Sequence, residues 1–431
     1  MAKEVKAAAG DRVRIETTDA SYEGLLMPEE EGFLVLKLDS GYNIGIAKGN
    51  VLSINLIEKK RELQAAKVKI PKKGLPTISI LHTGGTIASK VDYATGAVVA
   101  RFSPEELLAQ FPEIWEIANV SSRLVMNIFS EDMRFHHWNI LAQEIVKEIK
   151  AGARGIVITH GTDTLHYTSA ALSFMLQNLP IPVVLVGSQR SSDRPSTDAA
   201  LNLLSACLFA ARADFAGVVV CMHESIEDKS CIVLPATKCR KMHSSRRDAF
   251  KAIGTIPWAK VDFSSRKIEF LREDYERRSK REPKLTYINE AVKVGLLKVH
   301  PNMSAEEFLA FKGYDGLVIE GTGLGHAPIN ESDVATKEHS KIAEAISRLV
   351  SSGTVVAMAS QTIYGRIDLD VYSTGRRLQK LGVIGNHTDM SPETAFVKLA
   401  WLLSNYPKDM IEELFQKSIV GEVSERLEKI D

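Results

Sequence analysis

Residues 77–88, TISILHTGGTIA, run from an apolar, strand-like segment directly into a turn of threonines and glycines. Residues 155–164, GIVITHGTDT, repeat this arrangement. In open α/β sheets, ligands bind in the crevice outside the carboxyl ends of the strands. Two hydroxyl-bearing turns at that edge could supply a nucleophile, anion-binding amides and a second activated hydroxyl. The pair therefore predicts an α/β sheet and favours the hydrolysis of a small amide.

The alternation of strand and helix continues through the rest of the chain. Apolar runs lie at residues 183–186, 217–220, 317–319 and 355–359, and helical stretches at 138–149, 169–176 and 199–211. Such alternation is typical of parallel sheets with helices on both faces. We expect a larger α/β domain over 76–271, a charged connector over 272–284, and a smaller α/β domain with C-terminal helices over 285–431. Residues 391–393, SPE, supply a cap, a proline and an early acid for one of these helices.

The first sixty residues differ from the rest of the chain in their pattern of apolar and polar residues. Short runs that suit half-buried strands lie at residues 12–16, 22–27, 33–38, 43–46 and 51–57. Several short strands at close spacing are typical of a small barrel. We therefore expect a small N-terminal β-barrel as an accessory domain over 1–60, followed by a basic linker over 61–75.

Composition limits the class of protein. With 431 residues, the chain is too long for one ordinary domain. Its 45% hydrophobic and 25% charged residues are typical of a globular protein in water. A formal net charge of +0 argues against a chain whose main task is to hold a phosphate backbone. No segment suggests a signal peptide or a membrane span, and the four cysteines suggest buried, reduced thiols. We therefore expect a cytoplasmic protein that contacts no membrane and holds no metal.

The turns admit both a structural and a catalytic interpretation. Gly84 and Gly85 let the backbone approach a ligand and aim amide hydrogens at negative charge. Thr86 could then be a nucleophile, or it could simply cap a helix after a tight turn. Asp163 could likewise cap a helix, or hold an ammonium group from a substrate or a lysine. Lys238, taken alone, is interpreted as a solvated cation.

Taken in order, these motifs carry a specific resemblance. Four further pieces agree with them: residues 130–133 (SEDM), 187–190 (GSQR), 321–325 (GTGLG) and 392–395 (PETA). The GTGLG piece lacks the spacing of a dinucleotide-binding loop. Over residues 76–405 the chain resembles the bacterial-type L-asparaginase/glutaminase family. The resemblance implies an asparaginase-like α/β fold and an amidohydrolase that needs no cofactor of its own.

The resemblance also implies roles for individual residues. It implies catalytic roles for Thr86, Thr162, Asp163 and Lys238, and substrate-binding roles for Ser130, Glu131 and Gly161. In this scheme Thr86 is the nucleophile. Thr162 is a second threonine, which has Asp163 and Lys238 as its acid and base. The alternative for Ser130 is a cap before the helix expected near residue 135.

Two positions of the family's site are matched less directly. The family has a tyrosine on a loop after the first threonine turn, which activates the nucleophile, and Tyr93 is the candidate. The family often also places an acid from a neighbouring subunit in the site. Asp368 and Asp370 lie in the matching region, and the role is assigned to neither.

The N-terminal stretch narrows the resemblance. Residues 22–46, together with the rest of the chain, resemble the archaeal-type glutamyl-tRNA(Gln) amidotransferases. This implies a subunit that releases ammonia from glutamine, and a partner, the E-type subunit, that uses ATP and Mg to activate glutamate on tRNA(Gln). It also implies a homodimer within a heterotetramer, with tRNA bound mainly by the partner. The alternatives are a free-standing cytosolic L-asparaginase or glutaminase, and a non-catalytic sensor that binds an amino acid. The barrel would dock the partner or tRNA, or serve as a stabilising appendage.

Overall fold

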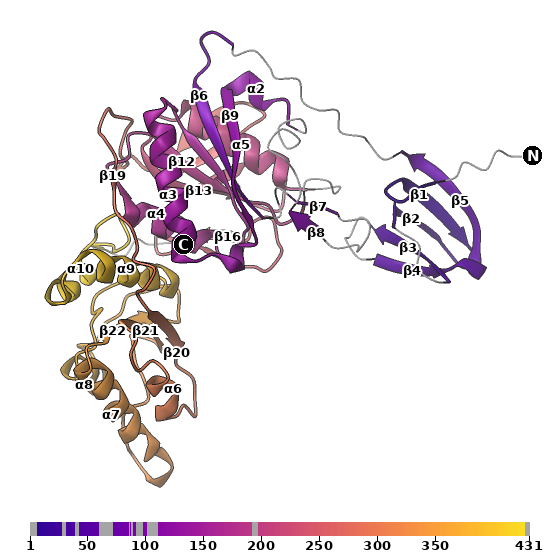
Figure 1. Cartoon of the computed structure of the whole chain (residues 1–431). Helices are drawn as coiled ribbons and strands as arrows, with labels where there is room; N and C mark the ends of the chain where they lie inside the picture. Colours follow the sequence, from indigo (N-terminus) through magenta and orange to yellow (C-terminus); the bar gives the residue numbers. More distant parts are fainter. Residues whose placement is uncertain are drawn as a thin grey trace, which may run out of the picture.

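Figure 1 shows a computed structural model of the whole chain. The structure describes residues 7–27, 32–38, 43–59, 72–85, 87, 89–91, 98–100, 111–191 and 197–426. Three groups of elements follow one another along the chain. They are an antiparallel sheet, a large mixed sheet with helices, and a smaller parallel sheet with helices.

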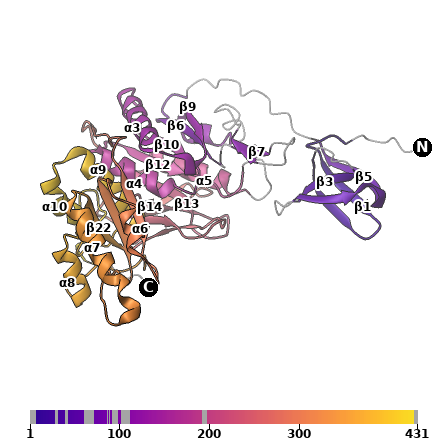
Figure 2. The ribbon, with the colours of Figure 1, turned by 60° about the horizontal axis from the view of Figure 1, so that its bottom comes forward.

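The N-terminal residues form a five-stranded antiparallel sheet in the order β4-β3-β2-β1-β5. Its strands are β1 (Arg12–Thr17), β2 (Ser21–Leu26), β3 (Phe33–Leu38), β4 (Asn43–Ala47) and β5 (Val51–Glu58). Val13 and Ile15 of β1 pack with Leu36 in a small core. Arg14, which lies between them in the chain, pairs with Glu23 of β2. The short strands expected here are therefore confirmed, and in Figures 1 and 2 this sheet lies apart from the other elements.

The largest group is an eight-stranded sheet in the order β18-β17-β14-β13-β12-β10-β6-β9. Its strands are β6 (Thr77–Gly84), β9 (Asn119–Ile128), β10 (Ile156–Thr159), β12 (Pro182–Val186), β13 (Gly217–His223), β14 (Cys231–Pro235), β17 (Ala259–Asp262) and β18 (Lys267–Phe270). From β13 to β9 the strands pair in parallel. From β13 to β18 they pair antiparallel, an edge that the strand-then-helix pattern did not predict.

Helices cover both faces of the parallel strands. They are α2 (Ile114–Ile117), α3 (Phe135–Lys150), α4 (Leu165–Met175) and α5 (Ala199–Arg212). Ile156 and Ile158 of β10 pack in the core that contains α3 and α4. Val157, between them, packs in the core that contains α5 and α2. Strands buried on both sides need apolar residues at successive positions, which explains the continuous apolar runs in the sequence.

The third group is a parallel sheet in the order β20-β21-β22. Its strands are β20 (Val294–Lys298), β21 (Gly316–Gly321) and β22 (Val355–Ser360). Between these strands in the sequence lie α6 (Ala305–Leu309) and α7 (Glu338–Ser351). After β22 come α8 (Ser373–Lys380), α9 (Pro392–Asn405) and α10 (Ile411–Gln416). The expected arrangement of a larger and a smaller α/β unit is therefore confirmed. The domain boundaries themselves remain predictions.

Helix α9 connects the two α/β units. It begins as the sequence predicted, with Ser391 accepting a hydrogen bond from the N–H of Thr394 and Pro392 in the first turn. It contacts α4 of the larger unit and all three strands of the smaller one. Trp401 of α9 stacks on Phe174 of α4, with ring centroids 5.5 Å apart. Helix α9 thus completes the core beneath α4.

Short elements complete the description. They are the hairpin of β7 (Ser89–Val91) and β8 (Val98–Ala100), the pair of β11 (Leu176–Gln177) and β19 (Lys284–Leu285), the hairpin of β15 (Cys239–Lys241) and β16 (Phe250–Ala252), and the 3-10 turns at Lys48–Asn50, Ser130–Asp132, Val334–Thr336 and Lys408–Met410. The four cysteines are buried and form no disulfide. Over the described ranges, no helix is both long and apolar enough to cross a membrane.

Candidate active site

The two threonine turns lie side by side. Strands β6 and β10 pair in parallel, with His82 opposite Thr159. The Oγ1 of Thr83 donates to the carbonyl oxygen of Thr159 at 2.9 Å, and Nδ1 of His82 lies 2.9 Å from the Oγ1 of Thr159. Because both strands end here in the same direction, both turns reach one edge of the sheet. That sequence prediction is confirmed.

The two threonine turns contact each other at Gly85 and Gly161. A Cβ atom placed on Gly85 would lie 2.3 Å from the backbone nitrogen of Gly161, and Gly85 has a positive φ of 78°. No other residue fits there without moving the second turn. Thr86 follows Gly85 directly, but Thr86 and Tyr93 lie outside the described residues. Their roles as nucleophile and activating tyrosine remain predictions.

Ser130 reaches the second turn from the end of β9. It is buried, and a Cβ atom on Gly161 would lie 2.8 Å from both its Cβ and its Oγ. The Oγ1 of Thr164 donates to the carbonyl oxygen of Ser130 at 2.5 Å. Helix α3 is capped at Arg134, so Ser130 is not its N-cap. Glu131, next in the chain, is exposed beside this contact.

The structure corrects the choice of lysine. Nζ of Lys241 lies 2.8 Å from the Oγ1 of Thr162 and 2.8 Å from the Oδ1 of Asp163. Nζ of Lys238 instead lies 2.6 Å from the Oδ2 of Asp389 and 2.8 Å from the Oγ of Ser424. The structure therefore does not bring Lys238 to the two threonine turns.

The physical reason lies in the β15 hairpin. Lys238 precedes β15, in a turn closed by its own N–H and the carbonyl of Pro235, and its side chain is buried against the C-terminal segment. Lys241 ends β15 on the side of Thr162. Arg240, between them, pairs with Glu393 of α9 at 2.7 Å. Three cationic residues, Lys238, Arg240 and Lys241, thus lie within four positions of the chain. The direction of the β15 hairpin determines which of them contacts Thr162.

The side chain of Lys241 is largely buried, but one of its two partners is exposed to solvent. The Lys241 side chain is 10% exposed, whereas that of Asp163 is 64% exposed. The ammonium group thus bridges a buried hydroxyl and a carboxylate at the surface. An exposed carboxylate on the turn that contacts Ser130 is suited to an ammonium group of a ligand, and the lysine can orient the Thr162 hydroxyl.

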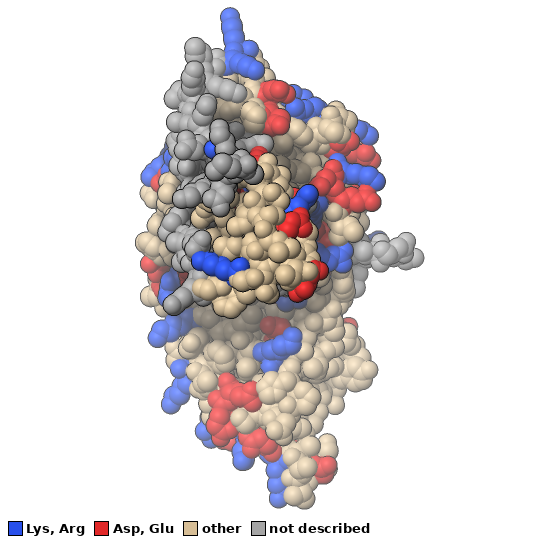
Figure 3. Space-filling model, turned by 90° about the vertical axis from the view of Figure 1, so that its right-hand side faces the viewer, with Lys and Arg blue, Asp and Glu red and all other residues tan. Residues whose placement is uncertain are grey.

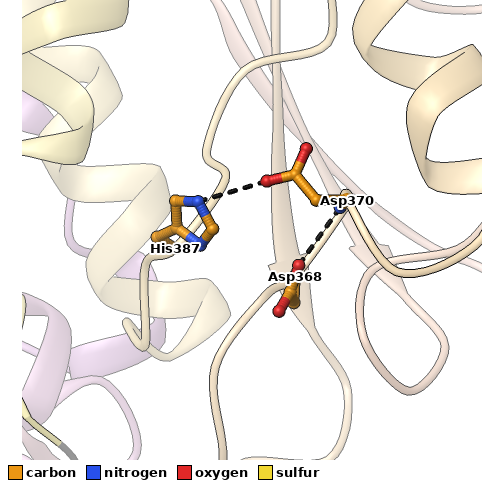
Figure 4. A group of neighbouring side chains, drawn as sticks. All are labelled: Asp368, Asp370 and His387. Carbon is orange, nitrogen blue, oxygen red and sulfur yellow. Dashed lines mark hydrogen bonds and ion pairs between the residues drawn. The ribbon is translucent and has the colours of Figure 1, made fainter.

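The acids Asp368 and Asp370 lie in the segment before α8, in the smaller unit (Figure 4). Oδ2 of Asp370 lies 3.3 Å from Nε2 of His387, and Oδ1 of Asp368 accepts from the N–H of Asp370 at 3.1 Å. The Asp370 carboxylate also accepts from Gln379 at 2.9 Å and from Asn386 at 2.8 Å. Asp368, Asp370 and His387 have ligand-type atoms within 4.8 Å of one another, but amide donors already occupy the carboxylate of Asp370. These contacts stabilise the loop that carries Asp368 and Asp370.

We expect Gly161→Ala to abolish most of the hydrolytic activity. The added methyl group would meet Ser130 at 2.8 Å and push the second turn away from Ser130, and a displacement of about 1 Å costs about 10²-fold in turnover. Gly49→Ala is the matched control, because its added Cβ meets no atom within 4 Å. Steady-state turnover of both variants checks this, and equal activities would contradict the packing.

Comparison with known proteins agrees with this geometry. Residues 77–276 match the family "Asparaginase, N-terminal", residues 293–415 match "Glutaminase/Asparaginase C-terminal domain", and residues 7–57 match "GatD N-terminal domain". The solved thermostable L-asparaginase from Thermococcus kodakarensis has a TM-score of 0.69 and 31% identity, covering 81% of this chain and all of that one. L-asparaginase I from Vibrio cholerae has a TM-score of 0.69 and 26% identity over the same share of this chain. Fold and site thus define an amidohydrolase of the asparaginase class.

Full-length relatives specify the branch of this class. The D-type subunit of glutamyl-tRNA(Gln) amidotransferase from Pyrococcus furiosus is 51% identical over 411 residues, which cover 92% of this chain and 90% of that protein. The protein of the same name from Archaeoglobus fulgidus is 46% identical, covering 96% and 95%. The chain belongs to the family of D-type subunits of glutamyl-tRNA(Gln) amidotransferase.

Proposed function

We propose that this chain is the glutaminase subunit of a tRNA-dependent amidotransferase. It converts glutamine and water to glutamate and ammonia, and the ammonia is consumed by a partner protein that amidates Glu-tRNA(Gln). The observation that carries the proposal is the contact of Lys241 with Thr162 and Asp163 beside Gly85, in a chain that matches its amidotransferase relatives along almost its whole length.

The proposed reaction runs in two halves. The Thr86 hydroxyl adds to the side-chain amide carbon of glutamine, and the carbonyl oxygen becomes an oxyanion that backbone N–H groups of the glycine-rich turns can stabilise. The C–N bond then breaks, and the nitrogen leaves as ammonia with the proton taken from the hydroxyl. Water adds to the resulting glutamyl ester, the ester C–O bond breaks, and glutamate leaves with the Thr86 hydroxyl restored.

The second turn and the residues that surround it take the remaining roles in this proposal. Lys241 holds the Thr162 hydroxyl, so that the hydroxyl can pass or receive a proton at the reacting amide. Asp163 and Glu131 are exposed to solvent and bind the α-amino group of the substrate. Ser130 binds its α-carboxylate. Lys241 replaces Lys238 in the scheme drawn from sequence alone.

The proposed assembly gives other tasks to the partner. The E-type subunit would hold ATP and Mg and most of the tRNA(Gln) contact, in a heterotetramer built on a homodimer of this chain in the cytoplasm. The net charge of +0 supports this division. On the face shown in Figure 3, Lys and Arg are interspersed with Asp and Glu. A chain with the main hold on a tRNA backbone would need a dominant basic surface.

Free glutamine is expected to be hydrolysed slowly by the isolated chain and rapidly once the partner and Glu-tRNA(Gln) are present. The experiment compares glutamine with asparagine, each with and without both additions. Rapid asparagine turnover by the isolated chain would favour the free-standing asparaginase, the activity named for the solved structural neighbours. The sensor alternative predicts no acyl adduct on Thr86 under any condition, which mass spectrometry of quenched reactions checks.

A further inference from the structure

His160 lies between β10 and α4, inside the second turn, and the reaction scheme above gives it no task. Its side chain has no exposed surface, and both ring nitrogens have partners. Nδ1 lies 2.6 Å from the carbonyl oxygen of Gly161. Nε2 lies 2.9 Å from the Oγ1 of Thr168 on α4.

The Gly161 carbonyl determines the direction of these hydrogen bonds. A carbonyl oxygen can only accept, so Nδ1 of His160 carries a proton and donates it to Gly161. The neutral ring has one proton, so Nε2 carries none and accepts from the hydroxyl of Thr168. The same hydroxyl accepts from Nε1 of Trp138 at 2.9 Å, which orients it. Burial lowers the pKa of His160 to about 4, which keeps the ring neutral at pH 7.

The Gly161 carbonyl belongs to the same peptide unit as the N–H of Thr162. In a trans peptide these two groups point in opposite directions, so a carbonyl held towards His160 directs the N–H away from it. None of the described residues accepts a hydrogen bond from this N–H. The hydroxyl of the same Thr162 is held by Lys241. A backbone donor with no acceptor among the described residues, beside the Gly85 turn, is suited to the oxygen of a reacting amide.

We propose that His160 is a positioning residue for amide hydrolysis. The Gly161 carbonyl and the Thr168 hydroxyl hold it as the Nδ1–H tautomer, and it fixes the Gly161–Thr162 peptide so that the N–H of Thr162 faces the reacting carbonyl. His160 itself touches no substrate. The expected effects on turnover rest on the proposed glutaminase function, whereas the tautomer and the peptide orientation do not.

The kinetic test uses the complete complex with partner and Glu-tRNA(Gln). His160→Ala is expected to lower kcat about 10- to 100-fold, with KM within about threefold, because the transition state loses an aligned donor while ground-state binding is kept. His160→Asn is expected to recover most of the loss, since its side-chain N–H stands where Nδ1–H stood. If His160→Asn is as slow as His160→Ala, or if His160→Ala keeps the parent kcat, the proposal is overturned.

Thr168 tests the tautomer through a residue further from the reaction. Thr168→Val removes the donor to Nε2 and is expected to lower kcat about 10-fold, whereas Thr168→Ser keeps the hydroxyl and should stay near the parent. Thr354→Val is the matched control, because Thr354 is equally buried and its hydroxyl donates to the carbonyl of Tyr314 at 2.8 Å. Equal losses in Thr168→Val and Thr354→Val would assign the effect to packing and overturn the proposal.

A spectroscopic readout separates this inference from the proposed function. In ¹⁵N-histidine NMR of the parent chain, the His160 signals, assigned by their absence in His160→Asn, should report a protonated Nδ1 and a bare Nε2 at pH 7. In Thr168→Val the Nε2 signal should shift, because the bare nitrogen loses its hydrogen-bond donor. A protonated Nε2 in the parent overturns the inference even if glutamine is hydrolysed. The expected pattern without any glutamine hydrolysis by the parent complex overturns the function and keeps the geometry.

Discussion

Lys241→Met is expected to lower glutamine turnover by about 10²- to 10⁴-fold, the range in which a positioned proton-transfer group contributes to catalysis. Methionine keeps the length and the apolar stem of lysine but removes the Nζ atom that holds Thr162 and Asp163 at 2.8 Å. Little stability should be lost, because the Asp163 side chain is 64% exposed and its charge stays solvated. Single-turnover hydrolysis in the complete complex, together with thermal unfolding of each variant, measures both effects.

Lys238→Met is the matched control, and it should behave in the opposite way. Its Nζ is buried and lies 2.6 Å from Asp389, whose side chain is 2% exposed. Removing this lysine leaves a buried carboxylate without its partner, at a cost of about 3–5 kcal/mol of folding free energy. The folded fraction should nevertheless turn over glutamine at nearly the parent rate. Loss of chemistry in Lys238→Met with full activity in Lys241→Met would restore the assignment made from sequence.

Lys398→Met is expected to destabilise the chain by about 3–5 kcal/mol, seen as a large fall in the denaturant midpoint. Lys398 of α9 and Glu422 are both fully buried, with Nζ 2.5 Å from Oε1. Burial lowers the pKa of Lys398, and the neighbouring Glu422 opposes that shift. Nζ also donates to the carbonyls of Phe415 and Lys417, at 2.8 and 2.6 Å. The variant would leave the buried carboxylate of Glu422 without its cation, held only by the N–H groups of Ile419 and Val420.

Two comparisons make this prediction specific. Arg348→Met breaks an exposed i,i+4 pair with Glu344 on α7 and should change stability by less than about 1 kcal/mol. Lys398→Met combined with Glu422→Leu removes both charges and should recover a large part of the loss. A single Lys398→Met variant with the parent midpoint would show that the pair adds nothing to the stability of the C-terminal segment.

The features predicted well from sequence are those that depend on local pattern. Apolar runs followed by glycine turns placed β6 and β10, and parallel pairing of neighbouring strands then brings their turns together. The short alternating strands before residue 60 and the capped start of α9 at Ser391 follow the same kind of local rule. Ser130 lies against Gly161, and its role in substrate binding stays a prediction.

The features missed depend on contacts between distant segments. Lys238 and Lys241 cannot be told apart by composition, because the choice depends on how the β15 hairpin meets α4 and on a partner 151 positions away for Lys238. His160 was part of a quoted motif, but its importance depends on Trp138 and Thr168, which belong to two different helices. The antiparallel strands β17 and β18 alternate apolar and polar residues, but each has only four residues, the shortest run over which alternation indicates a strand.

The position of α9 has a consequence for the order in which the chain acquires its structure on the ribosome. The N-terminal sheet closes its core with residues up to β5 and can fold as soon as that segment emerges. The larger α/β unit cannot do so, because the core beneath α4 is filled by Trp401 and other residues of α9, which come much later in the chain. Nascent chains must therefore carry an open apolar face for roughly two hundred residues of synthesis, a period in which a chaperone can act.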